Sequence, residues 1–183
     1  FLNDRISKVQ IRSLRKQMGV MMQDSFIFSG TIMDNIRYGN KTATNEEIVE
    51  AAKTVRAHEF IKELEDGYET EVNERGTRLS VGQRQLISFA RALLADPKIL
   101  ILDEATSSID TETEMLLQEG LNRLLEGRTS FIIAHRLSTI KNATKIMYID
   151  EGEIKEMGNH DELLEKRGLY YKLYMSQYEF LEK

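Results

Sequence analysis

Short runs of consecutive apolar residues alternate along this chain with stretches whose apolar residues recur every three or four positions. The two clearest runs are Ile99–Leu102 and Phe131–Ala134, and Val20–Met22 is a shorter one. Runs without polar alternation are typical of strands that are covered on both faces, as in a parallel sheet. The pattern therefore predicts a strand at each of these three places.

The segment between the two clearest runs, residues 111–125, has the apolar spacing of a helix. Leucines at i, i+4, i+7 and i+8, counted from Leu117, lie on one helical face. Asp110 stands before the segment as an N-cap candidate, and Gly127 stands after it as a stop. A strand, a helix and a second strand form a crossover unit, which is right-handed in almost all proteins.

The last third of the chain has two further patterns. Ile146–Ile149 and Ile154–Met157 flank Gly152 and predict a β-hairpin with the glycine in its turn. Residues 169–183 hold four of the seven tyrosines and predict a terminal amphipathic helix that packs through them.

Residues 44–95 predict helices instead of strands. Thr44 with Glu47, and Ser80 with Gln83, have the spacing of capping boxes, in which two residues at a helix start bond to each other's backbone. Pro97, the only proline, follows the second predicted helix and cannot continue it. We therefore expect a helical lobe inserted into an α/β sheet.

Composition excludes several classes of function. With 183 residues, 41% of them hydrophobic, the chain can bury a core. The absence of cysteine excludes disulfide scaffolds, thiolate metal sites and cysteine nucleophiles. A net charge of −5 argues against nucleic acid as a partner and against binding to anionic membranes through bulk charge. The three histidines include His58 and His160, which have no partners at ligand spacing and are expected in solvent or in local caps.

Polar residues stand at the ends of the three apolar runs: Gln23, Asp103 with Glu104, and His135. If the runs are neighbouring parallel strands, these side chains converge on one edge of the sheet, where α/β proteins bind ligands. Two carboxylates, an amide and an imidazole suit a Mg²⁺-bound phosphate, with one carboxylate on the ion's water shell and the other on an attacking water. The alternative is that each residue merely ends a strand at solvent.

The start of the second capped helix is a candidate phosphate site. In Leu79-Ser-Val-Gly-Gln-Arg-Gln85 a hydroxyl, a glycine and unpaired backbone N–H groups come together, and helix N-termini attract phosphate. The alternative is an ordinary capping box, which the spacing of Ser80 and Gln83 already explains.

Taken in order, these motifs resemble the nucleotide-binding domain of ATP-binding cassette (ABC) transporters, and the resemblance covers essentially the whole chain. The residues that carry it are Met22-Gln23-Asp24, the sequence 79–85, Ile99-Leu-Ile-Leu-Asp-Glu104, Ser107-Ser-Ile-Asp110 and Ala134-His-Arg136. The fold that it implies is the mostly parallel α/β core of P-loop (RecA-like) NTPases, with an inserted helical subdomain.

The resemblance implies a role for each motif. Gln23 is the Q-loop glutamine on Mg²⁺ and its water, Asp103 is the Walker B carboxylate on the Mg²⁺ shell, and Glu104 is the general base. Ser80, Gly82 and Gln83 form the signature loop, which reaches the γ-phosphate of ATP held by the opposite subunit. Asp110 ends the D-loop at the dimer interface, and His135 is the switch histidine on the γ-phosphate.

The resemblance also implies the setting of the domain. Residues near 24–38 look like the region of exporters that contacts the transmembrane domain, with ATP and Mg²⁺ as cofactors, a second nucleotide-binding domain in a head-to-tail dimer as partner, and the cytoplasmic face of the cell membrane as location. The expected parts are the ATPase core up to the Q-loop (1–24), the helical subdomain (25–95) and the remaining core with the terminal helix (96–183). The alternative for residues 26–38 is a surface loop with core-facing Phe26, Phe28 and Ile36.

The chain departs from the family pattern in two places. Val81 replaces the first glycine of the usual Leu-Ser-Gly-Gly-Gln. The first turn of a helix accepts a β-branched residue such as valine, so we expect only a mild effect. No Gly-x-x-x-x-Gly-Lys-[Ser/Thr] phosphate loop occurs, and the chain starts at Phe1, so we expect a piece of a longer protein that lacks the Walker A strand and helix. Such a piece should expose apolar surface and be inactive in isolation.

The leading hypothesis is therefore the C-terminal portion of an exporter's ATPase domain. A second is a soluble cassette that remodels DNA or ribosomes. The DNA-repair members of the family carry a long coiled coil between the Q-loop and the signature, and the absence of heptads there in this chain disfavours them. A third is a truncated, non-hydrolysing interaction module.

Overall fold

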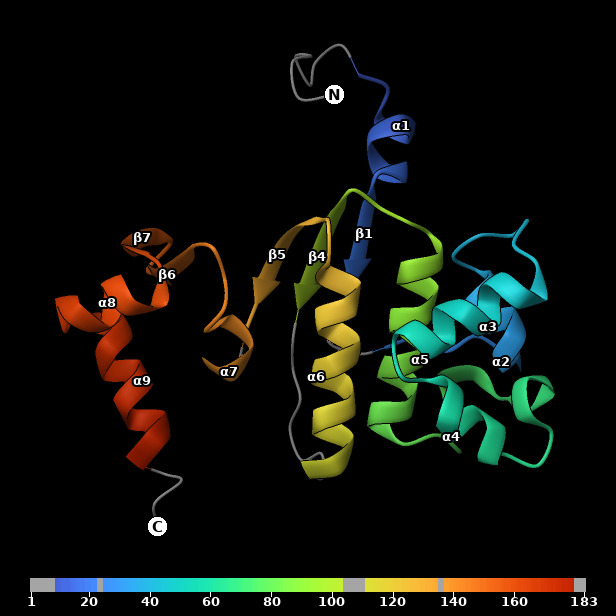
Figure 1. Cartoon of the computed structure of the whole chain (residues 1–183). Coiled ribbons are helices and arrows are strands. Elements are labelled where there is room, and N and C mark those ends of the chain that lie inside the picture. Colours follow the sequence, from blue (N-terminus) through green and yellow to red (C-terminus); the bar gives the residue numbers. More distant parts are fainter. Residues whose placement is uncertain (1–8, 23–24, 104–110, 135–136, 180–183) are drawn as a thin grey trace. The chain divides into compact units, whose positions relative to one another are not determined.

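The computed structural model of the chain describes residues 9–22, 25–103, 111–134 and 137–179 (Figure 1). The chain divides into two compact units, Phe1–Ile133 and Ala134–Lys183. Each unit has its own cluster of buried hydrophobic side chains.

The first unit contains a three-stranded parallel sheet. Its strands are β1 (Met18–Met21), β4 (Ile99–Asp103) and β5 (Thr129–Ile133), with β4 in the middle. Val20 pairs with Ile101, and Ile101 with Phe131. The three apolar runs are thus neighbouring parallel strands, and the α/β fold expected from the sequence is confirmed.

The two faces of this sheet differ in burial. Leu100 and Leu102 point to one face, where they are buried with side chains from helices of the same unit. On the other face Val20, Phe131 and Ile133 are 57%, 55% and 57% exposed. The sheet therefore carries the exposed apolar surface that the sequence led us to expect.

Six helices belong to the described part of the first unit: α1 (Ile11–Lys16), α2 (Ile32–Arg37), α3 (Asn45–Thr54), α4 (His58–Glu63), α5 (Val81–Leu94) and α6 (Thr111–Leu125). Short 3-10 turns lie at Gly67–Glu69 and Glu74–Gly76, and β2 (Gly30–Thr31) pairs antiparallel with β3 (Glu71–Val72). Helices α2, α3 and α5 each begin with a complete capping box. The boxes of α3 and α5 are the two expected from the sequence, and α6 has the predicted bounds.

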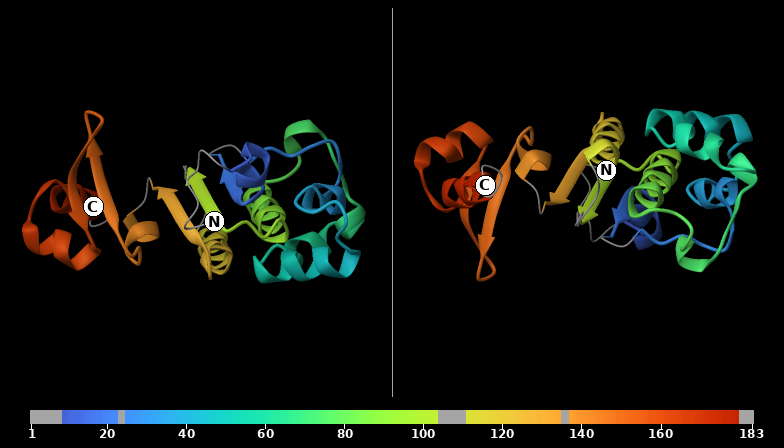
Figure 2. Two further views of the ribbon diagram at one scale, coloured as in Figure 1. Left: turned by 90° about the horizontal axis from the view of Figure 1, so that it is seen from above. Right: turned by 90° about the horizontal axis from the view of Figure 1, so that it is seen from below.

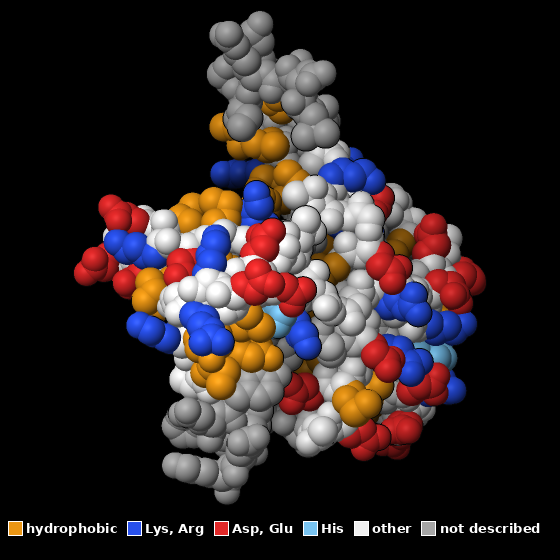
Figure 3. Space-filling model, turned by 60° about the vertical axis from the view of Figure 1, so that its left-hand side comes forward, with side chains coloured by type: hydrophobic (Ala, Val, Ile, Leu, Met, Phe, Trp, Pro, Cys, Tyr) orange, Lys and Arg blue, Asp and Glu red, His pale blue; other side chains and the backbone are white. Residues whose placement is uncertain are grey.

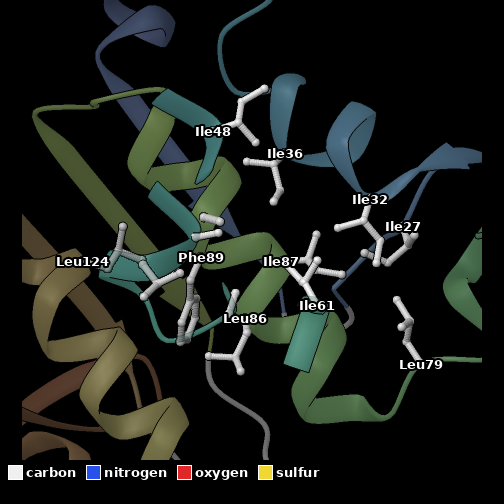
Figure 4. Close-up of a cluster of buried hydrophobic side chains, with 14 of the residues drawn as sticks. Ile27, Ile32, Ile36, Ile48, Ile61, Leu79, Leu86, Ile87, Phe89 and Leu124 are labelled. Atoms are coloured by element: carbon white, nitrogen blue, oxygen red, sulfur yellow. The ribbon is translucent and has the colours of Figure 1, made fainter. Parts of the chain in front are cut away.

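Helix α5 lies between the sheet and the other helices of the lobe (Figure 2). It packs against α2, α3 and α6, and its centre, residues 86–90, is buried together with Gly82 near its start. Figure 4 shows the cluster that forms there, in which Leu86, Ile87 and Phe89 of α5 meet side chains from α2, α3, α4 and α6. Because burial of one such side chain contributes roughly 1.5–3 kcal/mol, this helix holds the unit together.

Two glycines permit close backbone approach around this core. A Cβ on Gly39 would collide with the carbonyl oxygen of Arg91 in α5. A Cβ on Gly120 of α6 would lie 2.6 Å from the carbonyl oxygen of Val55, closer than real Cβ contacts come. Backbone cannot yield as a flexible side chain can, so these positions fix how near the neighbouring segments pack.

The second unit contains α7 (Leu137–Ile140), β6 (Ile146–Asp150), β7 (Glu153–Gly158), α8 (His160–Lys166) and α9 (Leu169–Glu179). Strands β6 and β7 form the predicted antiparallel hairpin, and Glu151 and Gly152 in its turn have positive φ. The hairpin exposes large apolar side chains, and hydrophobic and charged side chains are interspersed on the face drawn in Figure 3.

The histidines differ from expectation. His160 is only 8% exposed, and its Nδ1 lies 2.8 Å from the hydroxyl of Tyr170, which is itself buried. Nδ1 of His58 lies 2.9 Å from the hydroxyl of Tyr68. Burial, followed by the nearby carboxylates of the lobe, raises the pKa of Tyr68 to about 12. Both histidines thus pair with tyrosines ten positions later, and the expectation of a solvent position was wrong for His160.

The carboxylate of Glu156 ties the hairpin to the terminal helix. It accepts hydrogen bonds from the backbone N–H groups of Leu169 (2.8 Å) and Tyr170 (2.9 Å) at the start of α9. These two bonds hold the pKa of the Glu156 carboxyl below its usual value.

None of the helices within the described ranges combines the length and the apolar character that a membrane span requires.

Candidate functional site

Asp103 is the one predicted residue of the sheet edge that the structure describes. It is the last residue of the central strand β4, is partly exposed, and pairs with Ile133 at the end of β5. Gln23, Glu104 and His135 follow the ends of β1, β4 and β5 in sequence but lie outside the described residues. The order and parallel direction of the strands, on which the predicted site depends, are therefore observed, while three of its four side chains stay predictions.

The donor chemistry at this edge fits Mg²⁺. Within the described ranges no three Asp, Glu or His side chains cluster as a metal site. Magnesium, however, is commonly held by one or two carboxylates together with water and substrate phosphates. Asp103, at the carboxyl end of a strand in the middle of the sheet, meets that requirement.

The residues predicted to form the signature loop lie at the N-terminus of α5. Ser80 is the N-cap: its Oγ accepts the backbone N–H of Gln83 at 3.1 Å, and the Gln83 Oε1 accepts the backbone N–H of Ser80 at 2.9 Å. These bonds stay within the box and do not reach Asp103. The capping role, which was the alternative reading of these two residues, is therefore real.

Capping does not use up the polar groups at this helix start. The Ser80 hydroxyl accepts one hydrogen bond here and keeps its own proton to donate. The amides of Val81 and Gly82, the first two helical positions, have no acceptor inside a helix. A hydroxyl and two backbone amides without an intrahelical acceptor, at the positive end of a helix dipole, form a suitable set for an anionic oxygen.

Gly82 sets the contact between α5 and α6. A Cβ at this position would collide with Cγ2 of Thr113 and would lie 3.7 Å from Cδ1 of Leu117. The start of α5 thus lies directly against the first turns of α6, the helix that follows Asp110 in sequence. Asp110 itself is outside the described residues.

Val81, the departure from the family pattern, is 48% exposed at the first position of α5. Its side chain takes no part in the buried contacts between α5 and α6. The capping box of Ser80 and Gln83 is complete with this β-branched residue at the first helical position.

The segment 26–38 is built around α2 and three aromatic rings. Phe28 stacks on Tyr38 with ring centroids 4.3 Å apart, and Phe26 meets Phe28 edge-on at 4.9 Å. Phe26 and Tyr38 are 44% and 50% exposed, whereas Ile36 is buried. Of the three side chains expected to face the core, Phe26 thus faces outward. Both exposed rings line a cavity of about 330 Å³ beside β1 and α5.

Two residues that sequence reasoning did not single out hold this segment in place. Asn35, fully buried, bonds to the backbone of Phe28 and Thr31. Arg91, near the end of α5, bonds to Asn35 and to the carbonyl oxygen of Phe26. The available signal was an arginine on an otherwise apolar stretch of helix, Phe89-Ala-Arg-Ala-Leu93, which marks a charge that needs partners.

The sheet, the capped helix and their order along the chain define a nucleotide-binding cassette. The sequence profile of the family "ABC transporter" matches residues 1–107. The chain belongs to the ABC transporter family.

Three relatives illustrate the similarity. An uncharacterized ABC transporter ATP-binding protein, YknV of Bacillus subtilis (strain 168), is 58% identical over 94% of this chain and 29% of its own length. The ATP-dependent lipid A-core flippase of Syntrophus aciditrophicus (strain SB) is 53% identical over 94% and 29%. A fatty acid ABC transporter ATP-binding/permease protein of Mycobacterium bovis is 51% identical over 92% and 27%.

Among solved structures, that of a bacterial Atm1-family ABC exporter with ATP bound superposes with a TM-score of 0.85 at 42% identity. The match covers 94% of this chain and 30% of the exporter. The chain thus spans less than a third of the length of these relatives.

The Gly82 contact generates a prediction about stability. Gly82→Ala should destabilise the chain by about 1–3 kcal/mol, because the new methyl group has no room beside Thr113. Adding Thr113→Ser, which removes Cγ2 and keeps the hydroxyl, should recover most of that loss. Urea unfolding followed by circular dichroism measures both. Equal stability of Gly82→Ala and its double variant would show that the close approach is set elsewhere.

Proposed function

We propose that this chain is the C-terminal portion of the ATP-hydrolysing nucleotide-binding domain of an ABC exporter, in which a head-to-tail dimer couples ATP to transport. The observation that carries the proposal is the capped N-terminus of α5, packed through Gly82 on the helix that follows the 104–110 segment. The likeness to an exporter with ATP bound supports it.

Each residue has one task in this proposal. Asp103 and Gln23 would hold Mg²⁺, which neutralises phosphate charge when it is bound. Glu104 accepts a proton from the attacking water, and His135 contacts the γ-phosphate. Ser80, Gly82 and Gln83 present a hydroxyl and helix-start amides to the ATP of the opposite subunit. Asp110 belongs to the interface between the two domains.

The surroundings of the domain follow from the same proposal. Residues 1–24 and 96–183 contribute to the ATPase core, and residues 25–95 form the helical subdomain. The exposed rings of Phe26 and Tyr38, within residues 24–38, supply the contact with a transmembrane domain at the cytoplasmic face of the membrane. Exposed aromatic side chains are common anchors of protein interfaces.

The 183-residue polypeptide alone should bind Mg-ATP weakly and should hydrolyse it no faster than the uncatalysed rate in buffer. The reason is that its sequence contains no Gly-x-x-x-x-Gly-Lys-[Ser/Thr] loop to cradle the β-phosphate. Titration calorimetry and phosphate release test this. Micromolar binding with magnesium-dependent turnover would contradict it.

Glu104→Gln, in a transporter that includes this chain and a Walker A segment, should keep ATP binding and lower kcat by about 10²–10⁴-fold. An amide cannot accept the proton of water, and general bases typically contribute that factor. The variant should also accumulate the ATP-bound dimer, which is detected by the size of the assembly and by the nucleotide that stays bound to it. Turnover at the wild-type rate would exclude Glu104 as the base.

Ser80→Ala separates the cap from the phosphate contact. As a cap alone, the change should cost about 0.5–2 kcal/mol of stability and leave the activity of the folded protein intact. As a contact across the dimer it should weaken ATP-driven dimerisation about ten- to a hundredfold, the worth of one charge-assisted hydrogen bond.

A mixed dimer isolates this second effect. In the first arrangement, one subunit carries Ser80→Ala and the other carries a disabled Walker lysine; both lesions then lie in one composite site, and the other site should still hydrolyse ATP. In the second arrangement, both lesions are on the same subunit; they then lie in opposite sites, and both sites should be silent. Equal activity in the two arrangements would refute a role of Ser80 across the interface.

A further inference from the structure

Arg91 lies where α5 meets the segment 26–38. Its Nε donates to the backbone carbonyl of Asn35 at 2.9 Å, its Nη1 to the carbonyl of Phe26 at 2.9 Å, and its Nη2 to Oδ1 of Asn35 at 3.0 Å. The guanidinium also lies over the Phe28 ring, with Cζ 5.1 Å from the ring centroid. One side chain of the signature helix thus holds the segment at three of its residues.

Asn35 links Arg91 to the backbone of the segment 26–38. Its Oδ1 accepts the backbone N–H of Phe28 at 2.9 Å as well as the Arg91 bond, and its Nδ2 donates to the carbonyls of Phe28 (2.9 Å) and Thr31 (3.0 Å). Asn35 is fully buried, so these partners replace water completely. Arg91 and Asn35 therefore fix the backbone that carries the exposed rings.

The chemistry of this contact requires arginine. Its planar fork directs N–H groups to separate acceptors, whereas a lysine ammonium is a single compact point of charge. Three carbonyl oxygens accept the guanidinium bonds, and burial lowers the pKa of Arg91 from its usual value without discharging it. Gly39 adds a constraint, since its close approach to the Arg91 carbonyl brings the chain after α2 onto α5.

We propose that Arg91 is a positioning residue that couples the segment 26–38 to α5, so that movement of the signature end of α5 reaches the contact with the transmembrane domain. This inference rests on the proposed function. There, Ser80–Gln83 at the start of α5 contact the ATP of the opposite subunit, and the exposed rings of Phe26 and Tyr38 contact the transmembrane domain. Within one helix the two ends move together, because its backbone hydrogen bonds make it a stiff rod.

Hydrogen exchange of the full-length transporter in lipid nanodiscs, read by mass spectrometry, tests the positioning role. In the absence of nucleotide, Arg91→Lys should raise exchange in a peptide covering 26–38 about tenfold or more, because hydrogen bonds to a charged group hold it. Peptides covering β4 and β5 should stay within twofold of wild type.

Arg128→Lys is the matched control. The Arg128 side chain is 12% exposed and also donates to a backbone carbonyl, that of Leu124 at 2.9 Å, but its bonds do not reach residues 26–38. This variant should leave exchange of the 26–38 peptide within twofold of wild type. An equal rise in both variants, or a rise throughout residues 99–133 in Arg91→Lys, would reduce Arg91 to a general stabiliser and overturn the proposal.

The coupling role is read from the same protein with Mg-ATP and orthovanadate. In wild type, nucleotide should slow exchange in a peptide covering 79–90 and change it in the transmembrane peptides. In Arg91→Lys the first response should remain with an unchanged KM for ATP, and the second should fall about tenfold. A transmembrane response equal to wild type would overturn the proposal.

Two further outcomes are distinguishable. If wild type itself shows no nucleotide response in the 79–90 peptide, the proposed function fails, and the nucleotide-free exchange of 26–38 still decides whether Arg91 positions the segment. If Arg91→Lys does not accumulate as folded protein, Phe28→Leu replaces it. That variant keeps the three hydrogen bonds, removes the ring under the guanidinium, and should raise exchange of 26–38 about threefold; no rise would overturn the proposal.

Discussion

The burial of helix α5 is the constraint on which the rest of the first unit depends. Its apolar side chains fill the space between the parallel sheet and helices α2, α3 and α6, so every neighbouring element takes its position from this helix. Where the neighbours come closest, glycine replaces a side chain: Gly39 against the end of α5, and Gly82 against α6 at its start. Packing at interior density leaves little freedom for the helix to shift alone. The candidate site at its N-terminus and the contact at Arg91 are therefore parts of one packed body.

The elements predicted correctly are those with strong local signals. Uninterrupted apolar runs identified β1, β4 and β5, and their parallel pairing was expected because such runs are typical of strands in parallel sheets. The face that carries Val20 and Phe131 is nevertheless exposed in this chain. The capping boxes of α3 and α5 were recognisable because two side chains at fixed spacing satisfy two backbone groups. Helix α2 also begins with such a box, formed by Thr31 and Asp34, but an aspartate there is not the Glu or Gln of the usual pattern, and the sequence predicts a contact region or surface loop at residues 26–38.

What the sequence could not indicate were contacts between positions far apart in the chain. Arg91 bonds to Phe26, 65 positions away, and neither residue has a local pattern that names the other. The same holds for the pairing of β2 with β3, which joins Gly30 to Val72. For the candidate site, the motif order indicated the residues, and the structure adds the capped geometry of Ser80 and Gln83 and the placement of Asp103. Gln23, Glu104, Asp110 and His135 remain assigned from sequence.

Cap and anion site are compatible in one helix start because they use different atoms. The cap engages the Ser80 oxygen as an acceptor and the Gln83 amide as a donor, while an anion needs the Ser80 proton and the two free amides ahead of Gln83. In the proposed site, the cap would hold the Ser80 oxygen in place before phosphate binds, which would lower the conformational entropy lost on binding. From Ser80 to Arg91 the helix rises about 16 Å. A displacement of the helix start at Ser80 is therefore transmitted along the rigid helix to the carbonyl oxygens that Arg91 binds.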